Sequence, residues 1–402
     1  MKKILDGVKV VEFATFVAAP IASKLLAEWG AEVIKVENYS RDPMRKVGAL
    51  AKLPTEDNKN PGFDNMNGFK KSISINLKDE EGIKVLKDLI KDADIFITNY
   101  RKGALSKMTL TYEDLLKVNE KIIYASVSGY GETGPEEYKQ GYDITSYYAR
   151  GGVSGTLNDI DSYPLNTVQA FGDFQVGTYL ISGILAALYK KHTKGEGEYL
   201  NVSIYNTAIF NLGYPIMASQ FGFKYPISRF KNPNPLQGSY RTKDNRWIQF
   251  AIAIYDRDFP KVCEVIGRED LIEVESLAKF ENIVKDPEKL VRILDQEIPK
   301  KDADTWVKEM NARDIPCEKL VHWDEILLDE QAFASDCIGK IDYGDEEVKF
   351  IKSPVKFKTL GKYDVKRGPL YGEHTEEILK DINYTEEEIN QLKNKDIIRG
   401  NV

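Results

Sequence analysis

The sequence predicts an α/β fold in which a large, doubly wound, Rossmann-like domain is joined to a smaller α+β domain. The first observation is that short apolar strands alternate with amphipathic helices from residue 8 to about residue 130, as in parallel sheets with crossover helices. The second is a change of composition from about Tyr225, where "YPISRFKNPNPLQGSYRT" contains three prolines and is typical of a loop or linker. Short helices near the strand "WIQFAIAI" then indicate the smaller domain.

Apolar runs and their flanking residues predict the individual elements. Runs rich in Val and Ile predict strands over residues 8–14, 31–37, 72–78, 94–100, 121–130, 198–204 and 247–254. Apolar residues at helical spacing predict helices over residues 21–29, 79–93, 111–120, 173–192, 258–266, 287–297, 302–312, 323–334, 372–382 and 385–396. Thr385 followed by Glu388 has the spacing of a capping box, which supports the last of these helices.

Charge and hydropathy exclude several kinds of protein. The 402-residue chain carries a net charge of −7, so it lacks the basic character of a nucleic-acid-binding protein. An anionic ligand would have to be held locally, by a few Lys or Arg residues or by helix N-termini. No run of about 18 apolar residues is present, and Asp6, Lys9 and Glu12 interrupt the apolar start. We therefore expect neither a membrane span nor a signal peptide.

Cysteine and histidine are both scarce. The three Cys residues show no CxxC spacing, which predicts free thiols in a reduced, cytoplasmic protein. The three His residues show no zinc-type spacing such as HExxH, so we expect no metal site.

Two glycine-rich segments could bind an anion. "GYGETG" (Gly129–Gly134) has the letters of a dinucleotide fingerprint, but Pro135 follows and the first turn after a strand, "ATFVAAP", contains no glycine. We therefore expect no nicotinamide dinucleotide, and a loop over the carboxyl edge of the sheet instead. "RGGVSG" (Arg150–Gly155) fits a turn and an anion-binding loop equally well, and it lacks the helper His of a serine hydrolase.

The segment "FGDFQVG" places one carboxylate, Asp173, at the start of an apolar helix. Aspartate is a favoured helix N-cap, so a capping role fits this position. A chemical role fits as well, because an acid is otherwise out of place in a segment that should simply pack.

Nine segments, in this order, resemble the family III CoA-transferases, which include formyl-CoA transferase and the carnitine and bile-acid CoA-transferases. The segments are "LDGVKVVEFATFVAAP", "WGAEVIKVEN", "SRDPMR", "NGFKKSISINLK", "SGYGETGP", "GYDITSYYARGG", "FGDFQVG", "GILAALYKKHTKGEG" and "YGEHTEEIL". The likeness covers nearly the whole chain. It is strongest to the clostridial 2-hydroxyacid CoA-transferases, which act on 2-hydroxyisocaproate or phenyllactate.

The resemblance implies an architecture. It suggests a large domain whose N-terminal part is 1–224, a small domain over 225–320, and a return to the large domain over 321–402. It also implies a cytoplasmic, interlocked homodimer in which each chain threads a hole in the other. No nucleic acid and no membrane would be partners.

The resemblance also implies a reaction. CoA would move from an acyl-CoA or enoyl-CoA donor to a 2-hydroxy acid of the 2-hydroxyisocaproate or aryl-lactate type, during amino-acid fermentation. Asp173 would be the nucleophile and would carry CoA as an aspartyl-CoA thioester. A free aspartate has a pKa of about 3.9, so we expect Asp173 to be ionised at neutral pH without tuning. Coenzyme A enters as the acyl-CoA substrate, and the exchange of thioesters needs neither a metal nor ATP.

Other site residues are implied by position within the matching segments. The residues expected to bind CoA are Val17, Ala18, Asn38, Asn99, Lys107, Met108, Tyr142 and Asp143. The chain departs from the family in two places: many relatives have Gln where Val17 stands, and formyl-CoA transferase has Arg where Asn38 stands. Tyr142 could instead be a core aromatic.

Some side chains leave alternatives open. Three bases either help to bind phosphates or are ordinary solvated residues: Arg45, Lys70 and Lys71. An apolar pocket for the acid side chain is expected from Val17 together with Tyr205, Phe210, Tyr214, Met217 and Phe221.

Two other functions remain possible on the same fold. An α-methylacyl-CoA racemase would need a His where Tyr142 stands, and a phenol with a pKa of about 10 replaces imidazole, with a pKa of about 6.5, poorly in acid–base chemistry. A non-catalytic CoA-binding protein would not need the Gly172–Asp173 pair.

Overall fold

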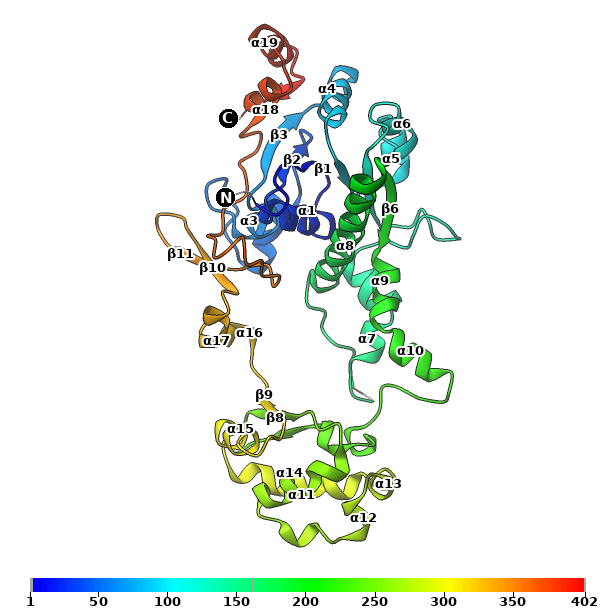
Figure 1. Ribbon diagram of the computed structural model, residues 1–402, viewed down its shortest axis with the longest axis vertical. Coiled ribbons are helices and arrows are strands. Elements are labelled where there is room, and N and C mark those ends of the chain that lie inside the picture. The colour runs from blue at the N-terminus through cyan, green and yellow to red at the C-terminus, as the bar shows by residue number, and fades with distance from the viewer. Residues whose placement is uncertain (1–2, 161, 401–402) are drawn as a thin grey trace. The chain divides into compact units, whose positions relative to one another are not determined.

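A computed structural model describes residues 3–160 and 162–400 (Figure 1). The chain forms two compact units. The first draws on three stretches, which end at Val153, run from Asn166 to Ile216 and begin again at Glu330. The second contains Ser154–Leu165 and Met217–Asp329, whereas the small domain expected from the sequence spans 225–320.

The first unit contains a seven-stranded sheet in the order β12-β3-β2-β1-β4-β5-β6. The strands are β1 (Lys9–Phe13), β2 (Glu32–Glu37), β3 (Lys71–Ile75), β4 (Ile95–Thr98), β5 (Ile123–Ser128), β6 (Glu198–Ser203) and β12 (Ile398–Arg399). All pairs are parallel except that of β12 with β3. The order reverses between β1 and β4, which confirms the predicted doubly wound, Rossmann-like sheet.

Helices cover both faces of this sheet (Figure 1). The helical segments of the large unit are α1 (Ala18–Glu28), α2 (Met44–Val47), η1 (Gly48–Ala51), α3 (Pro61–Asn67), α4 (Glu80–Lys91), α5 (Lys102–Lys107), α6 (Tyr112–Leu116), the π-helical η2 (Asp143–Arg150), α8 (Phe171–Lys194), α9 (Ile204–Asn211), α17 (Glu330–Ala334), α18 (Thr375–Asp381) and α19 (Glu386–Asn394). Two more, α7 (Val153–Thr156) and α10 (Gly213–Ser219), lie where the chain passes between units. A hairpin of β10 (Ile338–Asp342) and β11 (Glu347–Ile351) completes the large unit.

Successive side chains of each strand point to opposite faces of the sheet, and so contribute to two separate cores. Val10 of β1 packs with Leu26 of α1 and Leu180 of α8 on one face, whereas Val11 packs with Leu86 of α4 and Ile389 of α19 on the other. Because both faces are covered, most positions of the central strands are buried, and the buried polar ones, such as Glu12 of β1 and Lys35 of β2, are paired with each other. The predicted capping box of α19 is confirmed, since Thr385 and Glu388 bind each other's backbone.

The second unit is a small α+β structure. Its antiparallel sheet has β7 (Ser239–Arg241), β8 (Trp247–Phe250) and β9 (Cys317–Lys319). Its helical segments are η3 (Arg229–Lys231), η4 (Pro235–Gln237), α11 (Tyr255–Ile266), η5 (Glu269–Leu271), α12 (Glu275–Ala278), α13 (Phe280–Ile283), α14 (Glu288–Glu297), η6 (Ile298–Lys300), α15 (Ala303–Asn311) and α16 (Trp323–Ile326). Trp306 anchors the core and donates its indole N–H to the carbonyl of Ile298 at 2.7 Å.

One expectation needs correction, and one helix bears on the expectation that the chain has no membrane span. The helix expected over 323–334 is broken into α16 and α17, because the chain leaves one compact unit and enters the other between Asp329 and Glu330. Helix α8 is also long and apolar enough, by length and composition alone, to cross a membrane, although the sequence predicted no such segment. One face of α8, which includes Val176, Leu180 and Ile184, packs in the core of the large unit.

Candidate active site

The residues expected to form the site follow the carboxyl ends of parallel strands. Val17 and Ala18 come after β1, Asn38 after β2 and Asn99 after β4, while the segment of Tyr142 lies beyond β5. Carboxyl ends of parallel strands share one edge of the sheet, and ligands of open α/β sheets bind there, where the strand order reverses. The sheet reverses between β1 and β4, so the topology favours a site at this edge.

Asp173 lies in the first turn of α8. The helix begins at Phe171, and its N-cap is Ala170, whose backbone is left-handed with a φ of 66°. The alternative that Asp173 is the N-cap is therefore wrong. Asp173 is nevertheless an acidic residue in the first turn of a long helix, where the partial positive charge of the helix dipole favours an anion.

A second carboxylate, that of Asp143, lies against the start of α8. Asp143 is the first residue of η2, it is buried, and neither of its carboxylate oxygens has a hydrogen-bond partner within the described part of the chain. A Cβ atom added at Gly172 would fall less than 3.0 Å from Oδ1 of Asp143 and from the ring of Tyr147. Glycine at position 172 thus gives the Asp143 carboxylate room beside the helix that carries Asp173.

Both carboxyl groups have raised pKa values, and the charge of Asp143 adds to the cost of ionising Asp173. Burial, followed by the nearby charge of Asp143, raises the pKa of Asp173 to about 7. Burial also raises the pKa of Asp143 to about 6, while the backbone N–H groups of Gly172 and Ala170 oppose this shift. These amides face the carboxylate without reaching hydrogen-bond geometry. The expectation that Asp173 ionises without tuning is therefore wrong, because a buried carboxylate beside a like charge resists ionisation.

Helix α1 packs against the next turn of α8. A Cβ atom added at Gly177 would lie 3.0 Å from the carbonyl oxygen of Ala18 and closer still to the side chain of Ile21. Val17 is the N-cap of α1, and both Val17 and Ala18 are buried. The contact at Gly177 brings these two predicted site residues beside the turn of α8 that follows Asp173.

Asn99 and Asn38 use their side-chain amides within the chain. Asn99 accepts a hydrogen bond from the N–H of Thr15 at 3.0 Å and donates one to the carbonyl of Thr15 at 2.7 Å. This pair of bonds ties the end of β4 to the end of β1, where the strand order reverses. Asn38 accepts a hydrogen bond from the N–H of Ser40 at 2.9 Å and so shapes the turn after β2. Both residues are at the expected edge, but their amides are engaged by the backbone.

The remaining predicted residues differ in exposure. Lys107 is exposed at the end of α5, whereas Met108 is half-buried and packs on the core. Tyr142 is 49% exposed and its hydroxyl accepts a hydrogen bond from Gln140, so the core-aromatic alternative is wrong. Arg101 and Lys102 are exposed beside Lys107 on the same segment, and sequence reasoning missed them. The signal that could have found them is the basic run "NYRKGALSK" directly after β4.

The bases considered for phosphate binding do not fit that role equally. Arg45 pairs with Glu37 at 2.6 Å and Lys70 pairs with Glu12 at 2.6 Å, and all four side chains are buried. Arg45 and Lys70 are therefore neither phosphate ligands nor solvated bases. Lys71 remains half-buried, between acidic residues of β2 and α18.

The glycine-rich loop "GYGETG" folds back on the sheet. Its Glu132 accepts hydrogen bonds from the hydroxyls of Tyr199 and Ser126, and Gly131 and Gly134 have φ values of 102° and 94°. These contacts tie the Glu132 side chain to β5 and β6, next to the carboxyl edge over which the loop was expected to lie. Between residues 3 and 400, with residue 161 left aside, no group of three or more His, Cys, Asp or Glu side chains is placed to hold a metal ion.

The residues expected to line an acyl pocket are exposed in the single chain. Phe210 and Tyr214 of the large unit are 70% and 78% exposed, and Phe221 of the second unit is 85% exposed. Tyr205 is half-buried beside the ring of Tyr130. Each of these aromatic side chains is therefore at least partly open to solvent within its own unit.

Replacing Gly172 by alanine is expected to impair both stability and function. The new methyl group would displace Asp143 and the ring of Tyr147, and overpacking of this kind costs about 1–3 kcal/mol. Chemical denaturation of Gly172→Ala, with Gly213→Ala as a control, checks this, because a Cβ at Gly213 meets nothing within 4 Å. Equal stability of the two variants would contradict the close packing at Gly172.

Comparison with known proteins identifies the family of the chain. A sequence model described as CoA-transferase family III matches residues 5–375. The (R)-2-hydroxy-4-methylpentanoate CoA-transferase of Clostridioides difficile is 41% identical over 399 residues, which cover 98% of this chain and 100% of that protein. The cinnamoyl-CoA:phenyllactate CoA-transferase of Clostridium sporogenes is 40% identical over 402 residues, covering 98% and 97%.

A solved structure has the same fold over nearly the whole chain. The crystal structure of a CAIB/BAIF family protein from Brucella suis matches with a TM-score of 0.81 and 26% identity, over 95% of this chain and 100% of that one. The resemblance found in nine sequence segments is thereby confirmed. The chain belongs to CoA-transferase family III.

Proposed function

We propose that this protein transfers CoA from an acyl-CoA or enoyl-CoA to a 2-hydroxy acid that carries a branched or aromatic side chain, in amino-acid fermentation. The observation that carries the proposal is Asp173, a carboxyl of raised pKa in the first turn of α8, framed by Gly172 and the buried Asp143. Relatives at 41% and 40% identity are named for 2-hydroxy-4-methylpentanoate and phenyllactate, which are both 2-hydroxy acids of this kind.

The proposed reaction proceeds by four acyl exchanges at three carbonyl carbons: those of the donor, of Asp173 and of the acceptor. The Asp173 carboxylate attacks the thioester carbonyl of the donor, and the C–S bond breaks to give a mixed anhydride and CoA thiolate. The thiolate attacks Cγ of Asp173 and releases the donor acid, which leaves an aspartyl-CoA thioester. The acceptor carboxylate then attacks Cγ and expels the thiolate. Finally, the thiolate attacks the new acyl carbonyl and frees Asp173.

The environment of Asp173 favours the covalent anhydride and thioester over the free carboxylate. Ionised Asp173 is disfavoured by burial and by the charge of Asp143, as its raised pKa indicates. Acylation makes Asp173 neutral and removes both penalties. We assign to Asp143 the role of destabilising the free carboxylate relative to the anhydride and the thioester, which lowers the cost of forming them.

Exposed bases supply a place for the phosphates of CoA. The chain is acidic overall, so anion binding depends on local positive charge. Arg101, Lys102 and Lys107 are exposed on the segment after β4 at the expected edge of the sheet. We assign the phosphates to these bases and the pantetheine arm to the surface formed by Val17, Ala18, Asn38, Met108 and Tyr142. In this assignment Asn99 shapes the groove through Thr15 rather than through a contact of its own.

Mass spectrometry tests the proposed intermediate. The protein is incubated with cinnamoyl-CoA and then trapped with hydroxylamine, which converts an aspartyl thioester or anhydride to a hydroxamate. We expect the modification at Asp173 and formation of phenyllactyl-CoA when phenyllactate is added. An unmodified Asp173, or full transfer by Asp173→Ala, would overturn the mechanism. Exchange of an α-proton in heavy water without CoA transfer would favour the racemase-like alternative.

We propose that the protein is a cytoplasmic homodimer with interlocked chains. The outer face of α8 and the following helices expose large apolar side chains, since Tyr189, Phe210 and Tyr214 are each at least 70% exposed. Apolar patches of this kind on a single chain usually mark a protein interface. A second copy of the chain is the occupant that the family suggests. Three free cysteines suit a reducing compartment.

Light scattering after size exclusion checks the dimer. We expect a mass of twice 45.7 kDa, and we expect Tyr189→Asp together with Tyr214→Asp to weaken association because two charges would be buried at the interface. Lys121→Asp, a charge change on the loop before β5, serves as a control. A monomeric wild-type protein would contradict the proposal.

A further inference from the structure

The turn between β1 and α1 is held by side chains from other elements. Four consecutive backbone groups take part: the carbonyl of Ala14, the N–H and carbonyl of Thr15, and the N–H of Phe16. Their partners are Lys35 in β2, Asp42 in the loop after β2, and Asn99 after β4. Turns normally satisfy such groups with their own backbone or with water, so this arrangement needs an explanation.

Phe16 adopts an uncommon backbone conformation at the centre of this turn. Its φ is 63°, in the left-handed region that residues with a Cβ atom rarely occupy. Its ring is 37% exposed although it stands next to the buried Val17. A non-glycine residue keeps such a conformation only where its surroundings impose it, and such positions cluster at functional sites.

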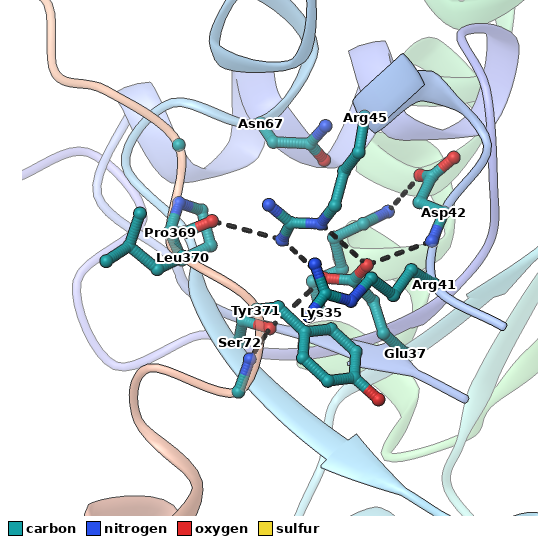
Figure 2. A network of polar contacts seen from close by, with 12 residues as sticks. Lys35, Glu37, Arg41, Asp42, Arg45, Asn67, Ser72, Pro369, Leu370 and Tyr371 are labelled. Carbon is teal, nitrogen blue, oxygen red and sulfur yellow. Dashed lines mark hydrogen bonds and ion pairs between the residues drawn. The ribbon is translucent and has the colours of Figure 1, made fainter. Parts of the chain in front are cut away.

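Asp42 imposes the conformation of Phe16. One oxygen of Asp42, Oδ1, accepts the N–H of Phe16 at 3.1 Å and the N–H of Met44 at 2.9 Å. The other oxygen, Oδ2, pairs with Nζ of Lys35 at 2.9 Å. Figure 2 shows the Lys35 side chain extended toward Asp42, while the backbone N–H of Asp42 is bonded to Glu37. Asp42 is thus fixed at its backbone and at both carboxylate oxygens.

A buried, neutral ionic cluster lies behind this contact. It contains three acids and three bases: Glu12, Glu37, Asp42, Lys35, Lys70 and Arg45. Lys35 also donates to Glu12 at 2.7 Å and to the carbonyl of Ala14 at 3.0 Å, and its third close contact is the ion pair with Asp42. Lys70 donates to the carbonyl of Pro20 in α1 at 3.0 Å. The cluster therefore fixes both the β1–α1 turn and the start of α1.

The turn leads directly to the candidate active site. Phe16 precedes Val17, the N-cap of α1, and Ala18 lies against α8 at Gly177. Asp173 is one helical turn before Gly177 on the same helix. A shift of the turn would therefore move the surface that faces the nucleophile.

We infer that Asp42 is a positioning residue for CoA transfer: it holds Phe16 in the left-handed conformation and so places the Phe16 ring, Val17 and Ala18 beside Asp173. This inference rests on the proposed function. Asp42 is buried and does not touch the substrate. Lys35 and Glu37 act through it by fixing its carboxylate and its backbone.

The first test compares variants that keep or lose the acceptor. Asp42→Asn retains an oxygen for the Phe16 N–H, whereas Asp42→Ala does not. We expect Asp42→Ala to lower kcat/KM for the acyl-CoA about 10- to 100-fold, as displacement of a supporting group does, and Asp42→Asn to retain most of the activity. Amide hydrogen exchange at Phe16 should become fast in the alanine variant only. Should Asp42→Ala not fold, Asp42→Ser takes its place.

A matched control removes another buried ion pair from the same part of the fold. Lys24 and Glu28 pair at 2.7 Å on α1, both are buried, and neither contacts the turn. Lys24→Met combined with Glu28→Gln should lower Tm with little change in kcat/KM. If Asp42→Ala lowers kcat/KM no more than this control at a similar loss of Tm, Asp42 is only structural and the inference is wrong.

A double-mutant cycle tests the conformational link. Glycine adopts a positive φ without help, so Phe16→Gly should make Asp42 dispensable for the backbone of the turn. We expect Asp42→Ala to lower kcat/KM much less in the Phe16→Gly background than in the wild type. An equal fold-decrease in kcat/KM in the two backgrounds would overturn the inference. Absence of CoA transfer by the wild-type protein would instead contradict the proposed function, so the two failures are distinguishable.

Discussion

Replacing Asp173 by asparagine is expected to abolish CoA transfer and, at the same time, to stabilise the folded chain at pH 8. Transfer is lost because an amide cannot attack the thioester, and removal of a catalytic nucleophile typically costs about 10⁴-fold or more in rate. CoA binding should persist, because the amide has nearly the shape of the carboxyl.

The gain in stability follows from proton linkage. The pKa of Asp173 is about 7 in the folded chain and about 3.9 in an unfolded one, so the folded chain holds this proton more tightly. As the pH rises from about 4 to 7, ionisation favours the unfolded chain, and the folded state loses stability over this window. Asparagine has no proton to lose, so the variant should be more stable by about 2–4 kcal/mol above pH 7 and similar to the wild type near pH 4.

Urea unfolding at pH 4.5 and pH 8, read beside the trapping experiment, checks both parts. Asp270→Asn is a suitable control, because its side chain lies on the surface in an ion pair with Arg268. Measurable transfer by Asp173→Asn would contradict the nucleophile. An unchanged stability at pH 8 would contradict the unfavourable environment of this carboxylate.

Replacing Asp143 by asparagine is expected to shift the pH profile of the reaction to lower pH and to reduce the amount of covalent intermediate. In the wild type, kcat/KM for the acyl-CoA should rise between about pH 5 and 8, as Asp173, whose pKa is raised to about 7, loses its proton. The asparagine variant keeps the shape but removes the like charge, so the pKa of Asp173 falls. Burial, the larger cause, remains, so that pKa should stay above about 3.9.

The relevant measurements are the pH dependence of kcat/KM and the fraction of aspartyl-CoA adduct at equilibrium. With Asp143→Asn we expect the midpoint of the pH profile of kcat/KM to move to lower pH. The ratio of the aspartyl-CoA adduct to the free enzyme should fall about tenfold for each pH unit of that shift, because acylation would then remove a smaller electrostatic penalty from Asp173. Asp159→Asn, on an exposed loop, should change neither quantity. A midpoint that does not move would show that Asp143 does not influence the nucleophile.

The sequence was sufficient for the fold but only partly for the site. Val and Ile runs of six or seven residues between amphipathic helices leave few alternatives to a parallel sheet, and β1, β2 and β4 lie within the predicted ranges. The helix of Asp173 was also predicted, although its start was placed two residues late. Local periodicity determines such elements directly.

The electrostatics could not be read from the sequence. Asp143 and Asp173 are separated by a loop and a helix turn, and only the close approach at Gly172 makes them a pair. Arg45 and Lys70 resemble surface bases in the sequence, because their acidic partners come from other strands. Asn99 was expected to face CoA, yet its amide is matched to Thr15 across the reversal of the sheet. Side chains that pair although they are far apart in the sequence leave no local sequence pattern from which the pairing can be predicted.

The pairing of β12 with β3 has a consequence for biosynthesis. Ile398 is the antiparallel partner of Ile75, so the outer edge of the sheet is closed by a strand that follows β3 in the chain only after the whole second unit. Until then β3 has one open edge, and an open apolar edge can pair with another chain. The inserted second unit, whose main segment ends at Asp329, is translated completely before that closure. Nascent chains of this protein should therefore depend on chaperone protection, or on rapid capture by a finished partner, until β12 has been translated.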